Sequence, residues 1–309
     1  MKKSVFGVID IGSLKVKLLI AEMKNGDISI LHKESKLTLL GNGLKEGKHR
    51  ILKRSLSNSL KAVKYFQDIC NKYNVKAIKM VATESIRKAD NVEEVLESFK
   101  NGSGNIPEII SQEDEAELFF KAVTRNFPKD KKVAVVDMGG GSIQILIGKR
   151  GEKCEMHFVP LGVYFLQQKF VTDTSNEGKP SDEELALLRG YIQGVLHASN
   201  VPMDIETPLI YGSSNVLDLF NMIPIKKAQS TLSSTHPYEV IPEELPVFLD
   251  EIKDLSHAQR EKKYPLQWGY MWGIQMAFYN AYYLAKRLGS KVIIPSNVNI
   301  SEGYILSMV

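Results

Sequence analysis

Two short segments far apart in the chain share one pattern, a β-rich apolar run that ends in Asp-x-Gly. The first segment is Val5 to Ser13, VFGVIDIGS, and the second is Val133 to Ser142, VAVVDMGGGS. Runs rich in valine and isoleucine are typical of buried strands. Glycines after such a strand expose backbone N–H groups that can approach a phosphate with no side chain in the way. The repeated pattern therefore predicts two strand-and-loop corners that suit a phosphorylated ligand.

Each corner carries an aspartate at the end of its strand, Asp10 in the first and Asp137 in the second. A carboxylate at this position can bind the divalent cation that accompanies a phosphate. An ordinary tight turn after a core strand explains a single Asp-x-Gly equally well. Because the pattern occurs twice, the phosphate interpretation is favoured. The residues that would cradle the phosphate are Gly12, Ser13, Gly139, Gly140, Gly141 and Ser142.

The similarity of the two corners extends into the residues that follow them. In each case a second apolar run, a turn signal and a third β-like run come next. These are 16–21, Asn25-Gly26 and 28–31 in the first copy, and 143–147, Arg150-Gly151 and 154–159 in the second. The duplication predicts two similar lobes that face each other across a cleft, in which a phosphorylated ligand and its metal would lie.

The rest of the chain alternates between helical and β-like patterns, which is typical of an α/β fold. Helical spacing or helix-capping signals occur at 51–73, 91–100, 111–127, 185–196, 216–220, 243–255, 256–263 and 268–288. Short β-like runs occur at 75–82, 106–110, 208–211 and 291–294, and 224–246 is predicted to be a surface excursion. We therefore expect an N-terminal lobe at 1–127, to which 297–309 returns, and a C-terminal lobe at 128–296.

A third small-residue loop follows the β-like run at 208–211. It reads Gly212-Ser213-Ser214-Asn215 and precedes a predicted helix. Two interpretations remain open, a third ligand-facing turn and a plain helix N-cap. Under the first, Gly212 and Ser213 would bind phosphate.

The composition excludes several classes of protein. With 309 residues, 43% hydrophobic and 25% charged, the chain suits a two-domain globular protein. A net charge of +4 is too small to favour nucleic acid as a partner. Two cysteines are too few for a disulfide framework, and no apolar run is long enough to span a membrane. We therefore expect a cytoplasmic protein.

Four motifs, in this order and spacing, resemble those of the Ppx/GppA phosphatases, which are exopolyphosphatases and guanosine pentaphosphate phosphohydrolases. The motifs are Asp10 to Ser13, Ala82 to Arg87, Glu113 to Ala116 and Asp137 to Ser142. The resemblance implies a two-lobed, actin-like ATPase (ribonuclease H-like) fold without the C-terminal helical domain of longer members. It also implies Mg²⁺-dependent hydrolysis of polyphosphate or pppGpp, and often a homodimer.

The resemblance assigns roles by position. Glu115 matches the catalytic glutamate and, at the start of a predicted helix, could deprotonate the attacking water. A favourable first-turn charge is the alternative explanation for Glu115. Arg87 matches an arginine that could bind a phosphate oxygen, although a structural ion pair would also explain it. Asp10 and Asp137 match the metal-binding aspartates.

The chain also departs from the family pattern, at Leu14, Lys15, Glu84, Ser85, Ile143, Gln144, Ser214, Asn215 and Ser301. At several of these positions a polar side chain that would bind a polyanion is missing. Gln144 replaces a glutamate, and a neutral amide can neither act as a base nor bring charge to a metal. Three functions follow. We expect first a phosphohydrolase, second a non-catalytic sensor of a phosphorylated ligand, and third, less favoured, a kinase that uses ATP.

Overall fold

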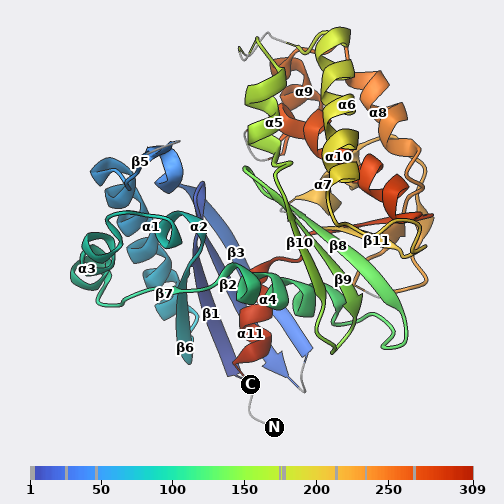
Figure 1. The fold of residues 1–309 in the computed structure, drawn as a ribbon. Coiled ribbons are helices and arrows are strands. Elements are labelled where there is room, and N and C mark those ends of the chain that lie inside the picture. The colour runs from blue at the N-terminus through green and yellow to red at the C-terminus, as the bar shows by residue number, and fades with distance from the viewer. Residues whose placement is uncertain are drawn as a thin grey trace. The chain divides into compact units, whose positions relative to one another are not determined.

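The computed structural model describes residues 4–24, 27–45, 48–173, 175, 179–212, 215–233, 235–266 and 269–308. The predicted Asn25-Gly26 turn, Ser213 and Ser214 lie outside the described residues. The chain forms two compact units (Figure 1), which are Met1–Ala122 together with Ile300–Val309, and Val123–Asn299. We call them unit 1 and unit 2.

Unit 1 is built around a five-stranded sheet with the order β3-β2-β1-β6-β7. Its strands are β1 (Ser4–Ile11), β2 (Lys15–Lys24), β3 (Asp27–Leu37), β6 (Ala77–Ala82) and β7 (Glu108–Ile109). Its α-helices are α1 (Lys53–Lys72), α2 (Glu84–Arg87), α3 (Val92–Ser103), α4 (Gln112–Thr124) and α11 (Ile300–Ser307). A short 3-10 helix, η1 (Leu40–Gly43), and a small ribbon of β4 (Leu44–Lys45) and β5 (Lys48–His49) complete the unit.

Side-chain alternation along β1 divides the core of unit 1 between the two faces of its sheet. Ile9 and Ile11 pack into a cluster that includes side chains of α1 and α3. Phe6 and Val8 point to the opposite face and pack with Tyr304 of α11. Helix α11 thus contributes side chains to the core of unit 1 (Figure 1).

Unit 2 repeats this topology with the sheet order β10-β9-β8-β11-β14. Its main strands are β8 (Lys132–Met138), β9 (Ile143–Lys149), β10 (Glu155–Val159), β11 (Leu209–Gly212) and β14 (Ile293–Ser296). Its helices are α5 (Val163–Phe170), α6 (Asp182–Ala198), α7 (Val216–Met222), α8 (Glu244–Ile252), α9 (His257–Lys263), η2 (Met271–Gly273) and α10 (Ile274–Leu288). In both sheets an antiparallel hairpin precedes two parallel strands, so the predicted duplication and α/β class are confirmed.

Two features of unit 2 differ from the sequence predictions. Helix α5 was not predicted, because its eight residues are rich in aromatic side chains and begin without a capping side chain. The surface excursion expected at 224–246 is wrong in part, because Ser233, His236 and Val240 are buried. This segment forms a ribbon of β12 (Ala228–Gln229) and β13 (Tyr238–Glu239), and Val240 bridges to Ile293 of β14.

Candidate functional site

Asp10 lies near the end of the central strand of unit 1 and is buried, with 3% of its surface exposed. It is paired with Lys17 in the β1–β2 ladder, and Lys17 Nζ lies 3.5 Å from Asp10 Oδ2. The other oxygen, Oδ1, is buried and has no hydrogen-bond partner among the described residues. A buried carboxylate oxygen without a donor is costly to desolvate, and it suits a ligand that carries positive charge or N–H and O–H groups.

The loop after Asp10 is held from one side by η1 and the residues before it. Gly41 N–H donates to the Ser13 carbonyl at 2.8 Å, and the Leu39 N–H donates to the Leu14 carbonyl at 3.0 Å. Within the loop, Gly12 N–H donates to the Lys15 carbonyl at 3.0 Å. The two groups of a planar trans peptide point in opposite directions. The N–H groups of Leu14 and Lys15, which share these peptides with the Ser13 and Leu14 carbonyls, therefore point away from η1.

Glu115 and Arg87 meet in unit 1. Glu115 lies in the first turn of α4 and Arg87 at the end of α2, and both terminal nitrogens of Arg87 lie 3.4 Å from Glu115 Oε2. Arg87 also donates to the Ile110 carbonyl at 2.7 Å. Both side chains are about one-fifth exposed. The ion pair that was the alternative explanation for Arg87 is thus present, and it holds the Glu115 carboxylate in place.

In unit 2, the three-glycine loop is docked on the start of α5. Val163, Phe165 and Gly162 donate their N–H groups to the carbonyls of Gly139, Gly140 and Gly141 at 2.9, 3.0 and 3.3 Å, respectively. A Cβ on Gly162 would overlap the backbone of Gly140 and Gly141. Only glycine at 162 therefore permits this close approach.

This docking fixes the direction of the loop's N–H groups. Three consecutive carbonyls point toward α5, so the N–H groups of Gly140, Gly141 and Ser142 point the opposite way. Gly140 and Gly141 are exposed. Successive N–H groups that point in one direction form a concave anion-binding feature. The loop can therefore bind a phosphate through its main chain.

Asp137 belongs to a polar row that crosses four strands of unit 2. It is opposite Gln144 in β9 and Gly212 in β11, and Gly212 is opposite Ser296 in β14. Alternation places these residues on the face opposite the main core, because Val136 and Ile143 point into that core. The strand pairing thus brings two predicted residues, Asp137 and Gly212, next to each other.

The structure shows what the departures from the family pattern do. Ile143 is a fully buried core residue, whereas Leu14 is half exposed. Glu84 pairs with Lys88 on the exposed side of α2, with 2.6 Å between Oε1 and Nζ. Ser85 Oγ donates to Ser13 Oγ, so Ser85 supports the first phosphate loop. Burial, and then the charge of Lys17, lower the pKa of Lys15 to about 8.

The donor set fits Mg²⁺ that arrives with a phosphate. Among the residues that the structure describes, no three His, Cys, Asp or Glu side chains form a group that could hold a metal. Mg²⁺ needs only one or two carboxylates when phosphate oxygens and water complete its shell. Asp10 Oδ1, which is buried and has no hydrogen-bond partner in the described part of the chain, would supply one such ligand.

Sequence reasoning missed Gly162 and Ser85 as parts of the loops. Gly162 lies against Gly140 and Gly141, which are 22 and 21 positions earlier in the chain, and Ser85 contacts Ser13, which is 72 positions earlier. Both contacts depend on how strands pair, so a local pattern could not reveal them. The single available signal was a glycine just after the third β-like run.

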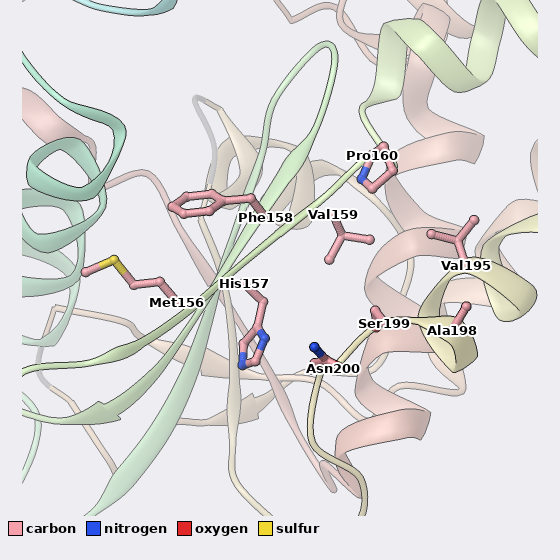
Figure 2. Close-up of a pocket in the computed structure, with 9 residues that line it drawn as sticks. All are labelled: Met156, His157, Phe158, Val159, Pro160, Val195, Ala198, Ser199 and Asn200. Carbon is pink, nitrogen blue, oxygen red and sulfur yellow. The ribbon is translucent and has the colours of Figure 1, made fainter.

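A cavity of about 510 Å³ lies between β10 and the end of α6 in unit 2 (Figure 2). The predicted site residues are not among the side chains that line it, which are Met156, His157, Phe158, Val159, Pro160, Val195, Ala198, Ser199 and Asn200. Apolar side chains and few charges make it a poor match for a polyanion.

No helix in the described part of the chain has the length and apolar character needed to cross a membrane.

Comparisons with known proteins agree with this architecture. The Ppx/GppA phosphatase family model matches residues 19–309. Exopolyphosphatase 1 of Mycobacterium tuberculosis is 26% identical over 196 residues, which are 63% of this chain and 56% of that protein. The exopolyphosphatase 1 of Mycobacterium leprae is equally similar over 57% of its length. The chain thus matches little more than half the length of these relatives.

Solved structures extend the match to the whole chain. The Aquifex aeolicus Ppx/GppA family member superimposes with a TM-score of 0.82 at 25% identity, covering 99% of this chain and 98% of that one. An exopolyphosphatase from Cytophaga hutchinsonii has the same fold, with a TM-score of 0.79 at 20% identity and coverage of 99% and 97%. The fold is therefore the actin-like α/β fold of these proteins, and the chain belongs to the Ppx/GppA phosphatase family.

Proposed function

We propose that this protein is an exopolyphosphatase-like phosphohydrolase that releases terminal phosphate from polyphosphate or pppGpp. Family membership supports phosphoanhydride chemistry, and the observation that carries the proposal is the direction of the N–H groups at Gly140, Gly141 and Ser142. Backbone donors that are fixed before the ligand arrives stabilise phosphate charge without reorganising during the reaction.

Glu115 is the proposed base that takes a proton from the attacking water. Its carboxylate is partly buried and is held by Arg87 at 3.4 Å. A base that is fixed in one orientation can keep a water molecule in line with the phosphorus atom. Arg87 thereby acts on the reaction through Glu115. We also propose a second role for Arg87, in which it binds a phosphate oxygen directly.

Asp10 and Asp137 are the carboxylates that we propose as Mg²⁺ ligands. When bound, Mg²⁺ neutralises the charge that develops on the phosphate oxygens. The Gly12–Ser13 and Gly139–Ser142 loops are the proposed phosphate-binding loops, through their N–H and hydroxyl groups. Gly212 is adjacent to Asp137 across the sheet and would let the phosphate chain pass close to the backbone.

Replacement of Glu115 by glutamine tests this assignment. Glu115→Gln keeps the size of the side chain but removes the base, so phosphate release from polyphosphate should fall about a hundredfold or more. Glu113→Gln is the matched control, because Glu113 lies in the same first turn of α4 and is exposed. Equal rates for the wild type and Glu115→Gln would overturn the role of Glu115.

A second candidate function is a non-catalytic sensor that binds a phosphorylated ligand without hydrolysing it. It is favoured by Gln144, which lies directly opposite Asp137 and brings a neutral amide to this position. Calorimetry with tripolyphosphate and Mg²⁺ separates the two functions. A sensor gives binding with no phosphate release, whereas Mg²⁺-dependent release that is lost in Asp137→Ala would exclude it.

A further inference from the structure

Tyr304 of α11 carries a buried hydroxyl that the proposed mechanism does not use. The residue is 4% exposed, and its hydroxyl oxygen has no hydrogen-bond partner among the described residues. Buried tyrosine hydroxyls normally find a partner, because an unpaired donor in the interior lowers stability. The missing partner therefore requires an explanation.

Asp10 presents the complementary group on the same face of the same sheet. Tyr304 belongs to the same buried cluster as Phe6 and Val8 of β1, and α11 contacts β1. Asp10 is two residues beyond Val8, so alternation directs its side chain to this face as well. Asp10 Oδ1 is buried and, within the described residues, has no donor. As far as the structure describes the chain, one unsatisfied donor and one unsatisfied acceptor thus lie on the face that packs with α11 and with Leu118 of α4.

The charges around Tyr304 identify its hydroxyl as a donor. Burial raises the pKa of Tyr304, and the carboxylates of Glu108, Asp10, Glu115 and Asp114 raise it further. The phenol therefore keeps its proton in the neutral pH range. A carboxylate oxygen accepts hydrogen bonds, so Asp10 Oδ1 needs a donor. A molecule that accepts from one group and donates to the other satisfies both, and water does so.

We propose that one ordered water bridges the Tyr304 hydroxyl and Asp10 Oδ1. The water accepts from Tyr304 and donates to Asp10, while Lys17 occupies the other oxygen of the carboxylate at 3.5 Å. Asp10 is then fixed from both sides in one orientation. Tyr304 becomes a positioning residue that acts through Asp10.

The role of this water in metal binding rests on the proposed function, whereas its presence does not. In the proposed function Asp10 would hold Mg²⁺, and a water that fixes the orientation of its carboxylate would favour that binding. Groups that orient a metal ligand in this way typically change metal affinity or activity by 10- to 100-fold when they are removed.

Crystal structures of the wild type and of Tyr304→Phe, at a resolution that reveals ordered water, test the proposal directly. We expect an oxygen peak within hydrogen-bonding distance of both atoms in the wild type and none in the variant. Tyr304→Phe keeps the ring in the buried cluster but leaves Asp10 Oδ1 without its donor, so its melting temperature without ligand should be lower than that of the wild type. The Mg²⁺ concentration that gives half-maximal phosphate release should rise about tenfold or more.

Tyr73→Phe is the matched control, because it removes a phenol hydroxyl from an exposed position at the end of α1 in the same unit. It should leave the Mg²⁺ requirement unchanged. The proposal is overturned if the density shows no water at this position, if the two atoms bond directly, or if Tyr304→Phe keeps the wild-type Mg²⁺ requirement. A wild type that holds the water but releases no phosphate overturns the hydrolysis and leaves the water site standing.

Discussion

His236 shows how a single buried side chain can make stability depend on pH. It is 1% exposed, and its ring nitrogens lie 3.0 Å from Ser233 Oγ and 2.9 Å from Ser296 Oγ. Burial, together with the charge of Arg125, lowers the pKa of His236 to about 4. The imidazole is therefore neutral in the folded protein at pH values where it would already be protonated in the unfolded chain.

This pKa shift predicts a loss of stability in acid. A histidine with a depressed folded-state pKa contributes fully above pH 6.5, and its contribution is lost as the pH falls from 6.5 toward 4. The shift corresponds to about 3 kcal/mol. In the His236→Gln variant, position 236 has no ionisable group. Between pH 7 and pH 4, the unfolding free energy of this variant should therefore decrease by about 3 kcal/mol less than that of the wild type. Urea unfolding at both pH values measures this, and equal losses would contradict it.

Single residues were the scale at which the sequence was least informative. The alternation in β9 could have shown that Ile143 points into the core, and the motif order indicated that Glu115 and Arg87 matter. The 3.4 Å contact between Glu115 and Arg87 depends on how α2 and α4 pack, which no local pattern contains. The catalytic roles of Glu115 and Arg87 and the metal-binding roles of Asp10 and Asp137 stay predictions.

At the level of elements, the sequence predicted most helices and strands but not helix α5, which supports the second phosphate loop. At the start of α6, Ser181 and Glu184 form a capping box, which is a purely local signal that the sequence carries. Helix α5 has no such signal, since its first N–H groups are capped by the carbonyls of the glycine loop. Its position follows from tertiary contacts that form only after the sheet does.

The contact between α5 and the glycine loop makes Gly162 a sensitive position. Gly162 has φ −63° and ψ 145°, a conformation that alanine also adopts, so any effect of Gly162→Ala comes from the contact. The added Cβ would overlap Gly140 and Gly141 and displace the loop. We expect a loss of about 1–3 kcal/mol in stability, together with weaker tripolyphosphate binding.

Gly190→Ala is the control for this prediction. Gly190 lies within α6, and a Cβ there has nothing within 4 Å. Alanine should stabilise the helix by about 0.5–1 kcal/mol and leave binding unchanged. Denaturant unfolding and calorimetry on both variants provide the comparison. If Gly162→Ala behaved like Gly190→Ala, the docking of the loop on α5 would not matter for the ligand.

At the scale of the whole molecule, the last helix completes the first unit. Gly303 of α11 lies so close to α4 that a Cβ would overlap the carbonyl of Leu118. Gly303→Ala should therefore push α11 away from α4 and destabilise unit 1 by about 1–3 kcal/mol or more.

Thermal unfolding followed by calorimetry would show this effect as a lower transition for unit 1. Gly194→Ala, in an open position of α6, is the control and should not lower the transition. An unchanged melting curve for Gly303→Ala would show that the two helices are not in close contact in solution.

The duplicated organisation of the molecule was the most predictable feature, because each unit carries its own copy of the strand, glycine loop and hairpin. The return of the chain to unit 1 was also expected from the sequence. The homodimer and the metal stay predictions, since they depend on groups beyond a single chain.

Phosphate release from polyphosphate by the purified protein, with Mg²⁺ and then with excess EDTA, decides whether the protein is a metal-dependent phosphohydrolase. We expect release that requires Mg²⁺ and that falls at least about a hundredfold in Asp10→Asn and, separately, in Asp137→Asn. An absence of release, or a rate that neither EDTA nor the two substitutions reduce, would contradict this expectation.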